Sequence, residues 1–196
     1  MSPNPALRAV LWDFGGVFST SPFDAFARYE RERGLPAGLL RTVNTINPDD
    51  NAWARLERAE ITVDEFDAAF DSAARALGHS APGRDVVRLL FGEIRPSMVE
   101  ALRRCRQVFR TACITNNFGD VGPDIVSPAR GAAWREVVGL FDFVLESSKV
   151  GVRKPEPAIY EMACERLGIS PHEAVYLDVL GINLKPAKAM GMATIK

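Results

Sequence analysis

The stretch Leu11-Trp12-Asp13-Phe14-Gly15-Gly16-Val17 decides the fold. The residues from Ala9 to Trp12 are apolar, and Asp13 and Phe14 are followed by the glycine pair Gly15-Gly16. This pattern predicts a buried parallel strand that ends in a tight loop. Asp13 would then lie at the carboxyl end of the strand, where open α/β sheets place their chemistry. An ordinary turn also uses Asp before Gly-Gly, so the downstream strands must decide between the two interpretations.

The length and composition are those of an ordinary globular protein. The chain has 196 residues, of which 47% are hydrophobic and 25% are charged, enough for one sizeable core or for a core with a smaller insert. A net charge of -1 and an isoelectric point near 6.2 argue against a nucleic-acid partner bound through a broad basic surface. We therefore expect no nucleic acid among its partners.

The cysteines, the histidines and the N-terminus bear on compartment and on metal chemistry. Cys105, Cys113 and Cys164 are odd in number and lie in apolar or helical patterns, which predicts free thiols in a reducing compartment. Two histidines make a His-based zinc site or a Ser-His-Asp triad hard to assemble. The stretch over residues 1–8 is short and polar and has no apolar signal region, and no later apolar segment is long enough to span a bilayer. We expect a cytoplasmic protein with no membrane partner.

The region that follows Val17 has helical rather than strand periodicity. Thr62 and Glu65 are spaced as a capping box, which predicts a helix that stops at Gly78. Four further helices are predicted around it, over residues 21–33, 39–46, 53–58 and 84–91. The region from about Ser19 to Glu93 therefore reads as an all-helical insert.

From Arg95 onward, strands and helices alternate. Short buried strands are predicted over residues 111–114, 143–145, 174–177 and 193–195, and helices over 96–108, 132–140, 155–167 and 183–190, with a surface loop over 119–131. Such alternation indicates a parallel sheet with right-handed crossovers, and thus an α/β fold.

The loops that leave the carboxyl ends of four predicted strands each carry polar residues of types that phosphate chemistry uses. Asp13 follows the first strand, Thr115 and Asn116 the second, Lys154 the third, and Asp178 the fourth. A strand-end carboxylate such as Asp13 can attack phosphorus and form an aspartyl-phosphate, which splits one hard hydrolysis into two easier steps. The combination is far more informative than any one member.

These stretches resemble the four motifs of the haloacid dehalogenase (HAD) superfamily of hydrolases. The last two look closest to the subgroup that includes the phosphatase domain fused to some epoxide hydrolases. The matching stretches are Asp13-Phe14-Gly15-Gly16-Val17, Ile114-Thr115-Asn116, the run from Ser147 to Pro155, and Tyr176-Leu177-Asp178 with Asn183-Leu184-Lys185. The resemblance implies a Rossmann-like parallel sheet core over residues 1–18 and 95–196, with an all-helical cap domain over residues 19–94.

Each motif residue has a role that the resemblance implies and chemistry supports. Asp13 would be the nucleophile, while the Thr115 hydroxyl and the Asn116 N–H would donate to phosphate oxygens, although Thr115 could equally cap a helix. Lys154 would offset phosphoryl charge, and Pro155 would start the next helix. Gly16 and Asn117 are expected to bind substrate.

The chain departs from the family pattern at two acid positions. Gly15 stands where phosphatase members usually carry a general acid and base, a loss that should cost on the order of 10²–10⁴-fold in rate unless another group substitutes. Val179 stands where a second acid often binds Mg²⁺. Asp13, the Gly15 carbonyl and Asp178 are the remaining candidate ligands for Mg²⁺. Asp178 could instead be a structural acid that orients Lys154.

These observations give three hypotheses for function. The first is hydrolysis of a small phosphate monoester through an Asp13 aspartyl-phosphate. The second is a catalytically silent phosphate-binding or regulatory protein, which Gly15 and Val179 favour. The third is a 2-haloacid dehalogenase, although those enzymes usually carry an aromatic residue at the Gly15 position and a Ser-rich fourth motif.

The cap and the end of the chain suggest further expectations. Side chains of the cap would meet the leaving group, with candidates Phe18, Tyr29, Asn44, Asn47 and Trp53, of which Phe18 and Trp53 read better as core. Lys196 follows the last predicted strand directly, which would leave a sheet edge open and hints either at a partner, such as a second copy in a homo-oligomer, or at a shortened C-terminus.

Overall fold

The computed structural model describes residues 7–119 and 121–196. Its core is one five-stranded sheet in the order β3-β2-β1-β4-β5, with every adjacent pair parallel. The strands are β1 (Ala9–Trp12), β2 (Arg110–Thr115), β3 (Phe143–Glu146), β4 (Ala174–Leu177) and β5 (Ala193–Ile195). The predicted α/β fold and all five predicted strands are confirmed. Residues 1–6 of the predicted core range, and Asp120 of the predicted loop, lie outside the described residues.

The central strand, β1, is buried along its whole length. Leu11 lies opposite Ala112 of β2 on one side and opposite Tyr176 of β4 on the other. From β1 the chain builds β2 and β3 on one side and then crosses to β4 on the other. The strand order therefore reverses at β1, and its carboxyl end is the position at which open α/β sheets bind ligands.

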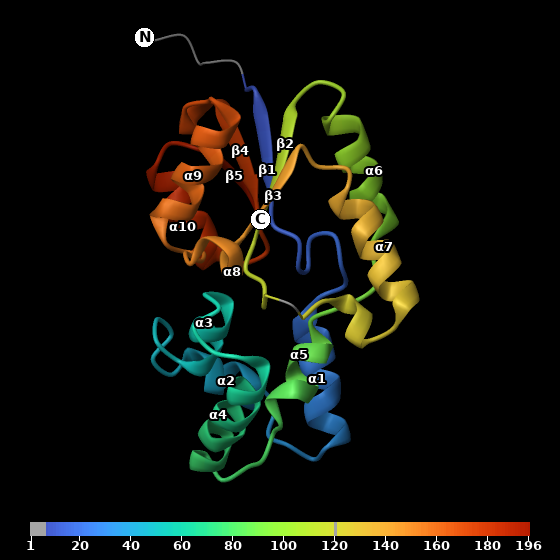
Figure 1. Cartoon of the computed structure of the whole chain (residues 1–196), viewed down its shortest axis with the longest axis vertical. Helices are drawn as coiled ribbons and strands as arrows, with labels where there is room; N and C mark the ends of the chain where they lie inside the picture. Colours follow the sequence, from blue (N-terminus) through green and yellow to red (C-terminus); the bar gives the residue numbers. More distant parts are fainter. Residues whose placement is uncertain (1–6, 120) are drawn as a thin grey trace.

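Helices cover both faces of the sheet (Figure 1). On one face lie α6 (Pro96–Cys105) and α7 (Pro128–Val138), which bury Val10 and Trp12 of β1. On the other lie α9 (Pro157–Leu167) and α10 (Gly181–Ala189), which bury Leu11. Successive β1 residues thus enter opposite cores, as the two-residue repeat of a strand requires, and this explains the unbroken apolar run.

The segment between β1 and α6 is helical and has its own core. It contains α1 (Pro22–Glu32), α2 (Leu39–Thr45), α3 (Ala52–Glu57), α4 (Val63–Ala76) and α5 (Gly83–Leu89). The predicted capping box at Thr62 and Glu65 is present at the start of α4. Aromatic and aliphatic side chains such as Phe66 and Phe70 fill the space between these helices. In Figure 1 the segment lies beyond the carboxyl ends of the strands.

Two adjacent stretches of backbone connect this segment to the rest of the chain. Ser19 and Ile94 form an antiparallel bridge, and the Thr20 N–H donates to the Glu93 carbonyl at 2.8 Å. The entry and exit of the segment are therefore hydrogen-bonded side by side. We propose that residues 19–94 form a cap, which we name the helical cap, on a core made of the remaining described residues.

Some predicted boundaries were wrong for local reasons. Helix α7 begins at Pro128, inside the predicted 119–131 loop, because the Ser127 side chain accepts a hydrogen bond from the Arg130 N–H and caps it. Helix α9 begins at Pro157 rather than Pro155. Three short elements were not predicted: η1 (Pro123–Ile125), α8 (Ser147–Val150) and η2 (Pro171–Glu173).

The cysteines and the membrane expectation can be checked directly. Cys113 and Cys164 are buried, Cys105 is half-buried, and all three thiols are free. Within residues 7–119 and 121–196, no helix combines the length and the apolar character needed to cross a bilayer.

Candidate active site at the carboxyl edge of the sheet

Asp13 lies directly after β1 and is 7% exposed. Its N–H donates to the Leu177 carbonyl of β4 at 2.8 Å, which extends the parallel ladder and fixes the backbone of the acid. Its Oδ1 accepts a hydrogen bond from Lys154 Nζ at 2.6 Å. Burial raises the pKa of Asp13 to about 6, although the nearby Lys154 ammonium acts in the opposite direction.

Lys154 supplies the positive charge of the site. Lys154 is 2% exposed, and its Nζ lies 2.6 Å from Asp13 Oδ1 and 3.1 Å from Asp178 Oδ2. Burial alone would lower the pKa of Lys154, but the two carboxylates outweigh it and raise that pKa above its usual value. Lys154 is therefore an ammonium that bridges two buried acids.

Asp178 is held by several donors. Its Oδ2 accepts from Lys154 Nζ, from the Tyr176 hydroxyl and from Asn183 Nδ2 at 2.9 Å, while its Oδ1 accepts from the Leu180 N–H at 2.7 Å. Burial acts to raise the pKa of Asp178, but Lys154 and these hydrogen bonds bring it below the usual value. Of the two predicted roles for Asp178, these contacts favour the structural acid that orients Lys154.

The Asn116 side chain holds the backbone of Lys154 at two points. Asn116 Oδ1 accepts from the Lys154 N–H at 2.8 Å, and Asn116 Nδ2 donates to the Lys154 carbonyl at 3.0 Å. Sequence reasoning assigned Asn116 a backbone contact to phosphate and missed this side-chain clamp. Thr115 Oγ1 lies 3.4 Å from the Asn116 carbonyl, a long contact that leaves the hydroxyl free to turn elsewhere.

Asn117 joins the loop after β2 to the segment after β3. Its N–H donates to Ser147 Oγ at 3.0 Å, its Nδ2 donates to Glu146 Oε1 at 2.9 Å, and its Oδ1 accepts from the Ser148 hydroxyl at 2.7 Å. The structure thus directs the Asn117 side chain toward β3 and α8. Its substrate-binding role stays a prediction.

Gly16 shapes the loop that follows Asp13. It has a φ of +79°, a conformation that favours glycine, and its N–H donates to Ser19 Oγ at 3.1 Å. Its carbonyl accepts from Arg95 Nη1 at 3.2 Å, a contact that no sequence pattern pointed to. A substrate-binding role for Gly16 also stays a prediction.

The two departures from the family pattern differ structurally. A Cβ built on Gly15 would meet nothing within 4 Å, so the position of the usual general acid is open space. Val179 is packed instead, because a Cβ built on Gly16 would lie 3.2 Å from Val179 Cγ2.

These residues fit a magnesium ion poorly. Val179 offers no oxygen, and Lys154 Nζ already bridges Asp13 and Asp178. Within the described parts of the chain, no cluster of three or more Asp, Glu, His or Cys side chains could hold a metal. Asp13, the Gly15 carbonyl and Asp178 remain candidate donors, but the Lys154 ammonium lies against an oxygen of each of the two acids and competes there with a cation.

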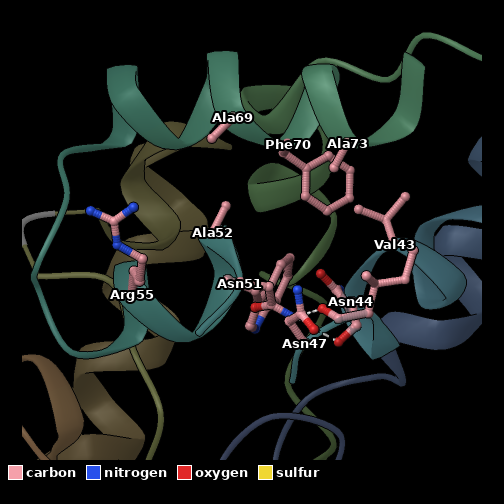
Figure 2. A pocket seen from close by; sticks show the side chains of 11 residues that line it. Val43, Asn44, Asn47, Asn51, Ala52, Arg55, Ala69, Phe70 and Ala73 are labelled. Atoms are coloured by element: carbon pink, nitrogen blue, oxygen red, sulfur yellow. Dashed lines mark hydrogen bonds between the residues drawn. The ribbon is translucent and has the colours of Figure 1, made fainter. Parts of the chain in front are cut away.

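The suggested cap contacts lie away from Asp13 or inside hydrophobic cores. Asn44, Asn47 and Trp53 line a cavity of about 220 Å³ whose walls come entirely from α2, α3, α4 and their connections (Figure 2). Phe18 is fully buried in the core that contains Trp12, and the Tyr29 hydroxyl donates to Asp85. As expected, Phe18 and Trp53 pack as core residues.

One cap residue that sequence reasoning missed reaches the site. Glu57, at the end of α3, accepts from Asn116 Nδ2 at 3.0 Å and from Arg153 Nε at 2.6 Å. Glu57 and Asn116 are 59 residues apart, and no motif spacing connects them.

A buried strand-end aspartate, paired with a lysine from a neighbouring loop and covered by helices, defines a class of α/β hydrolases. The sequence model of the haloacid dehalogenase-like hydrolase family matches residues 7–178, so the chain belongs to this family. It is 32% identical over 202 residues to mouse bifunctional epoxide hydrolase 2, covering 97% of this chain and 36% of that protein. The chain thus spans about a third of that relative. This confirms the predicted superfamily and subgroup resemblance.

Other relatives carry phosphatase and dehalogenase names. The chain is 27% identical to Phosphatase MT3486 of Mycobacterium tuberculosis, covering 95% of this chain and 85% of that protein. HAD family enzyme BT-2542 of Bacteroides thetaiotaomicron, solved with magnesium and inorganic phosphate, superposes with a TM-score of 0.62 at 18% identity, covering 97% and 94% of the two chains. L-2-haloacid dehalogenase of Xanthobacter autotrophicus gives 0.63 at 18%, covering 96% and 76%.

Proposed function

We propose that this hydrolase cleaves small phosphate monoesters through an Asp13 aspartyl-phosphate. The observation that carries the proposal is the buried pair at the end of β1, in which Lys154 Nζ lies 2.6 Å from Asp13 Oδ1. A carboxylate held on a rigid strand end beside a fixed ammonium can both attack phosphorus and neutralise phosphoryl oxygens. The phosphatase name of the M. tuberculosis relative supports the same chemistry.

The reaction would occur in two displacements at phosphorus. An oxygen of Asp13 forms a bond to phosphorus while the phosphorus–oxygen bond to the alcohol breaks, and the departing alkoxide takes a proton from water because Gly15 supplies none. Water then attacks the phosphorus of the aspartyl-phosphate and gives a proton to the hydroxide that the first step left, the bond to Asp13 breaks, and inorganic phosphate and the Asp13 carboxylate are released. A water-derived proton is a weaker aid than a positioned acid, so we expect slow turnover.

The other site residues would bind the phosphoryl group. In this proposal, the Thr115 hydroxyl and the Asn116 N–H donate to non-bridging oxygens, and Gly16 and Asn117 shape the loops that surround the phosphoryl group. Lys154 remains an ammonium throughout, because Asp178 holds it from the far side at 3.1 Å.

We propose that turnover depends only weakly on Mg²⁺. The similar B. thetaiotaomicron structure contains magnesium with phosphate, but in this chain Val179 offers no ligand and Lys154 bridges the two acids. No step above needs a metal. A bound metal would contribute several kcal/mol of transition-state stabilisation, so a kcat that is nearly the same with and without Mg²⁺ is the expected result.

Gly15 and Val179 together favour a second candidate, a silent protein that binds phosphate compounds. Such a protein would keep the Asp13–Lys154 pair and the phosphate donors but lack useful turnover. The two candidates predict the same binding and different chemistry, so one set of measurements separates them.

The deciding experiment compares wild-type protein with Asp13→Asn on a panel of phosphate monoesters, with and without Mg²⁺. Turnover that Asp13→Asn abolishes supports the hydrolase. If the wild type shows no turnover above the variant, a thermal shift with inorganic phosphate or beryllium fluoride would support the silent binding protein, because ligands that bind the folded state raise its stability. Halide release from 2-haloacids in the same assays would identify a dehalogenase instead.

A further inference from the structure

Two buried glutamates of the helical cap make different contacts. Glu30 of α1 is 4% exposed and accepts from the Gly38 and Leu40 N–H groups at 2.7 and 2.9 Å, which ties α1 to the start of α2 within the cap. Glu57, the last residue of α3, is 6% exposed, and its carboxylate faces the core. The cap thus offers one buried acid that serves its own fold and one that meets the site.

Glu57 binds the core through both its carboxylate and its backbone. Oε2 accepts from Arg153 Nε at 2.6 Å and from Asn116 Nδ2 at 3.0 Å, and Oε1 accepts from Trp53 Nε1 at 2.9 Å. The Glu57 carbonyl accepts from Ser147 Oγ at 2.6 Å. Two connections at the carboxyl edge of the sheet, the loop after β2 and the segment between β3 and α9, therefore meet at one residue of α3.

The contact with Asn116 fixes which way its amide points. A carboxylate can only accept hydrogen bonds, so Glu57 must face the NH₂ end of the Asn116 amide. That orientation leaves Asn116 Oδ1 to accept from the Lys154 N–H at 2.8 Å, while the second amide hydrogen reaches the Lys154 carbonyl at 3.0 Å. The two Lys154 contacts require the same orientation, so Glu57 reinforces the amide orientation that clamps Lys154.

Arg153 adds a second connection to the same stretch of chain. Its side chain is 14% exposed, pairs with Glu57 and also donates from Nη1 to the Pro48 carbonyl at 3.2 Å, in the loop between α2 and α3. Burial raises the pKa of Glu57 and the Arg153 guanidinium opposes that rise. The residue just before Lys154 is thus bound to the helical cap at two points.

We propose that Glu57 is a positioning residue through which the helical cap holds the Lys154 backbone, so that Lys154 Nζ meets Asp13 when the cap is seated on the core. The chain of contacts runs from Glu57 to Asn116, to the Lys154 backbone, and through the Lys154 side chain to Asp13. The structural part stands on these contacts alone, whereas its consequence for catalysis rests on the proposed function.

Amide hydrogen exchange tests the structural part without any activity assay. The Lys154 N–H should exchange at least about 10-fold faster in Glu57→Ala than in wild type, measured against the Ile114 amide of β2 as a reporter of global opening. Glu30→Ala is the matched control, since it loses a buried cap acid that has no role in the clamp. It should leave the ratio of the two amides unchanged.

Glu57→Gln keeps the volume of the side chain and guards against a Glu57→Ala variant that does not fold. Its amide has one acceptor oxygen where the carboxylate has two, so it should give a Lys154 exchange rate between those of wild type and Glu57→Ala. If both Glu57 variants leave Lys154 as well protected as Glu30→Ala does, the positioning role is wrong.

Kinetics test the consequence for catalysis. If the wild type hydrolyses a phosphate monoester, Glu57→Ala should lower kcat by about 10-fold or more with less than about 3-fold change in KM, and Glu57→Gln should recover part of the loss. A loss confined to KM would contradict positioning of Lys154. If the wild type has no turnover, the proposed function fails, while the exchange experiment still decides the role of Glu57.

Discussion

The sharpest test of the site is Lys154→Met, which removes one charge from the buried trio of Asp13, Lys154 and Asp178. The side chains of Lys154, Asp178 and Asp13 are 2%, 0% and 10% exposed. Methionine keeps most of the packing of the lysine stem, so the main loss is charge compensation. Removing one partner of a buried ion pair costs about 3–5 kcal/mol, or about 6–20 °C in Tm for a protein of this size.

The loss should depend on pH with a definite sign. In the wild type, burial already raises the pKa of Asp13 to about 6, above its unfolded value, so its contribution favours folding at low pH and is lost as pH rises through about 6. Without the Lys154 ammonium, that pKa must rise further. The stability deficit of Lys154→Met should therefore be small near about pH 5 and should grow toward about pH 8, by about 1.4 kcal/mol for each unit of added rise.

Urea unfolding of both proteins at several pH values measures this deficit. Lys149→Met is the matched control, because Lys149 pairs with Glu146 on the same segment but is 72% exposed, so its loss should cost no more than about 1 kcal/mol at any pH. Adding Asp13→Asn to Lys154→Met should recover most of the stability, since Asp178 keeps its other donors. A deficit that is the same at every pH would refute the charge argument.

Three further predictions concern the nucleophile and the two departures. Gly15→Asp should raise kcat by about 10²-fold, because an acid there can donate a proton to the leaving group and a Cβ at Gly15 meets nothing within 4 Å. Gly16→Asp is the control and should bring no gain, since the Gly16 φ of +79° and the nearby Val179 disfavour a side chain. Val179→Asp should strengthen Mg²⁺ binding in a calorimetric titration, and a folded variant with unchanged affinity would show that the metal position is misplaced. The kcat/KM should fall below about pH 6 as Asp13 takes up a proton, and a carboxyl ¹³C NMR titration, with Asp13→Asn to identify the signal, separates this from ionisation of the substrate.

The sheet could be predicted because its signals are local. Each strand is a short apolar run that ends on a turn or a polar residue, and burial on both faces makes such runs continuous. The convergence of Asp13, Lys154 and Asp178 also followed, since parallel strands place their carboxyl ends at one edge. The start of α7 was predicted too late, because the Gly- and Pro-rich composition before it indicates a loop and hides the N-cap at Ser127.

The side-chain contacts of the site could not be read in the same way. The Asn116 amide bonds to the Lys154 backbone, 38 residues away, and to Glu57, 59 residues away. Neither spacing follows from a helical or a strand period. The first depends on how the loop after β2 packs against the segment after β3, and the second depends on how the cap meets the sheet. Glu57 and Glu30 are both buried acids of cap helices, and no sequence signal shows which of the two contacts the site.

Gly15 and Val179 are changes of different kinds, and this decides how each would respond to restoration. Gly15 is an empty position on an intact loop, so an acid placed there adds a proton donor to the framework that already holds Asp13 and Lys154. Val179 is a filled position against Gly16, so an acid there also removes a packing contact, and it has value only if a cation accompanies the added negative charge. Gly15→Asp should therefore act in metal-free buffer, whereas Val179→Asp should act only when Mg²⁺ is added. If both depended on Mg²⁺, the metal rather than Lys154 would be the main positive charge of the site.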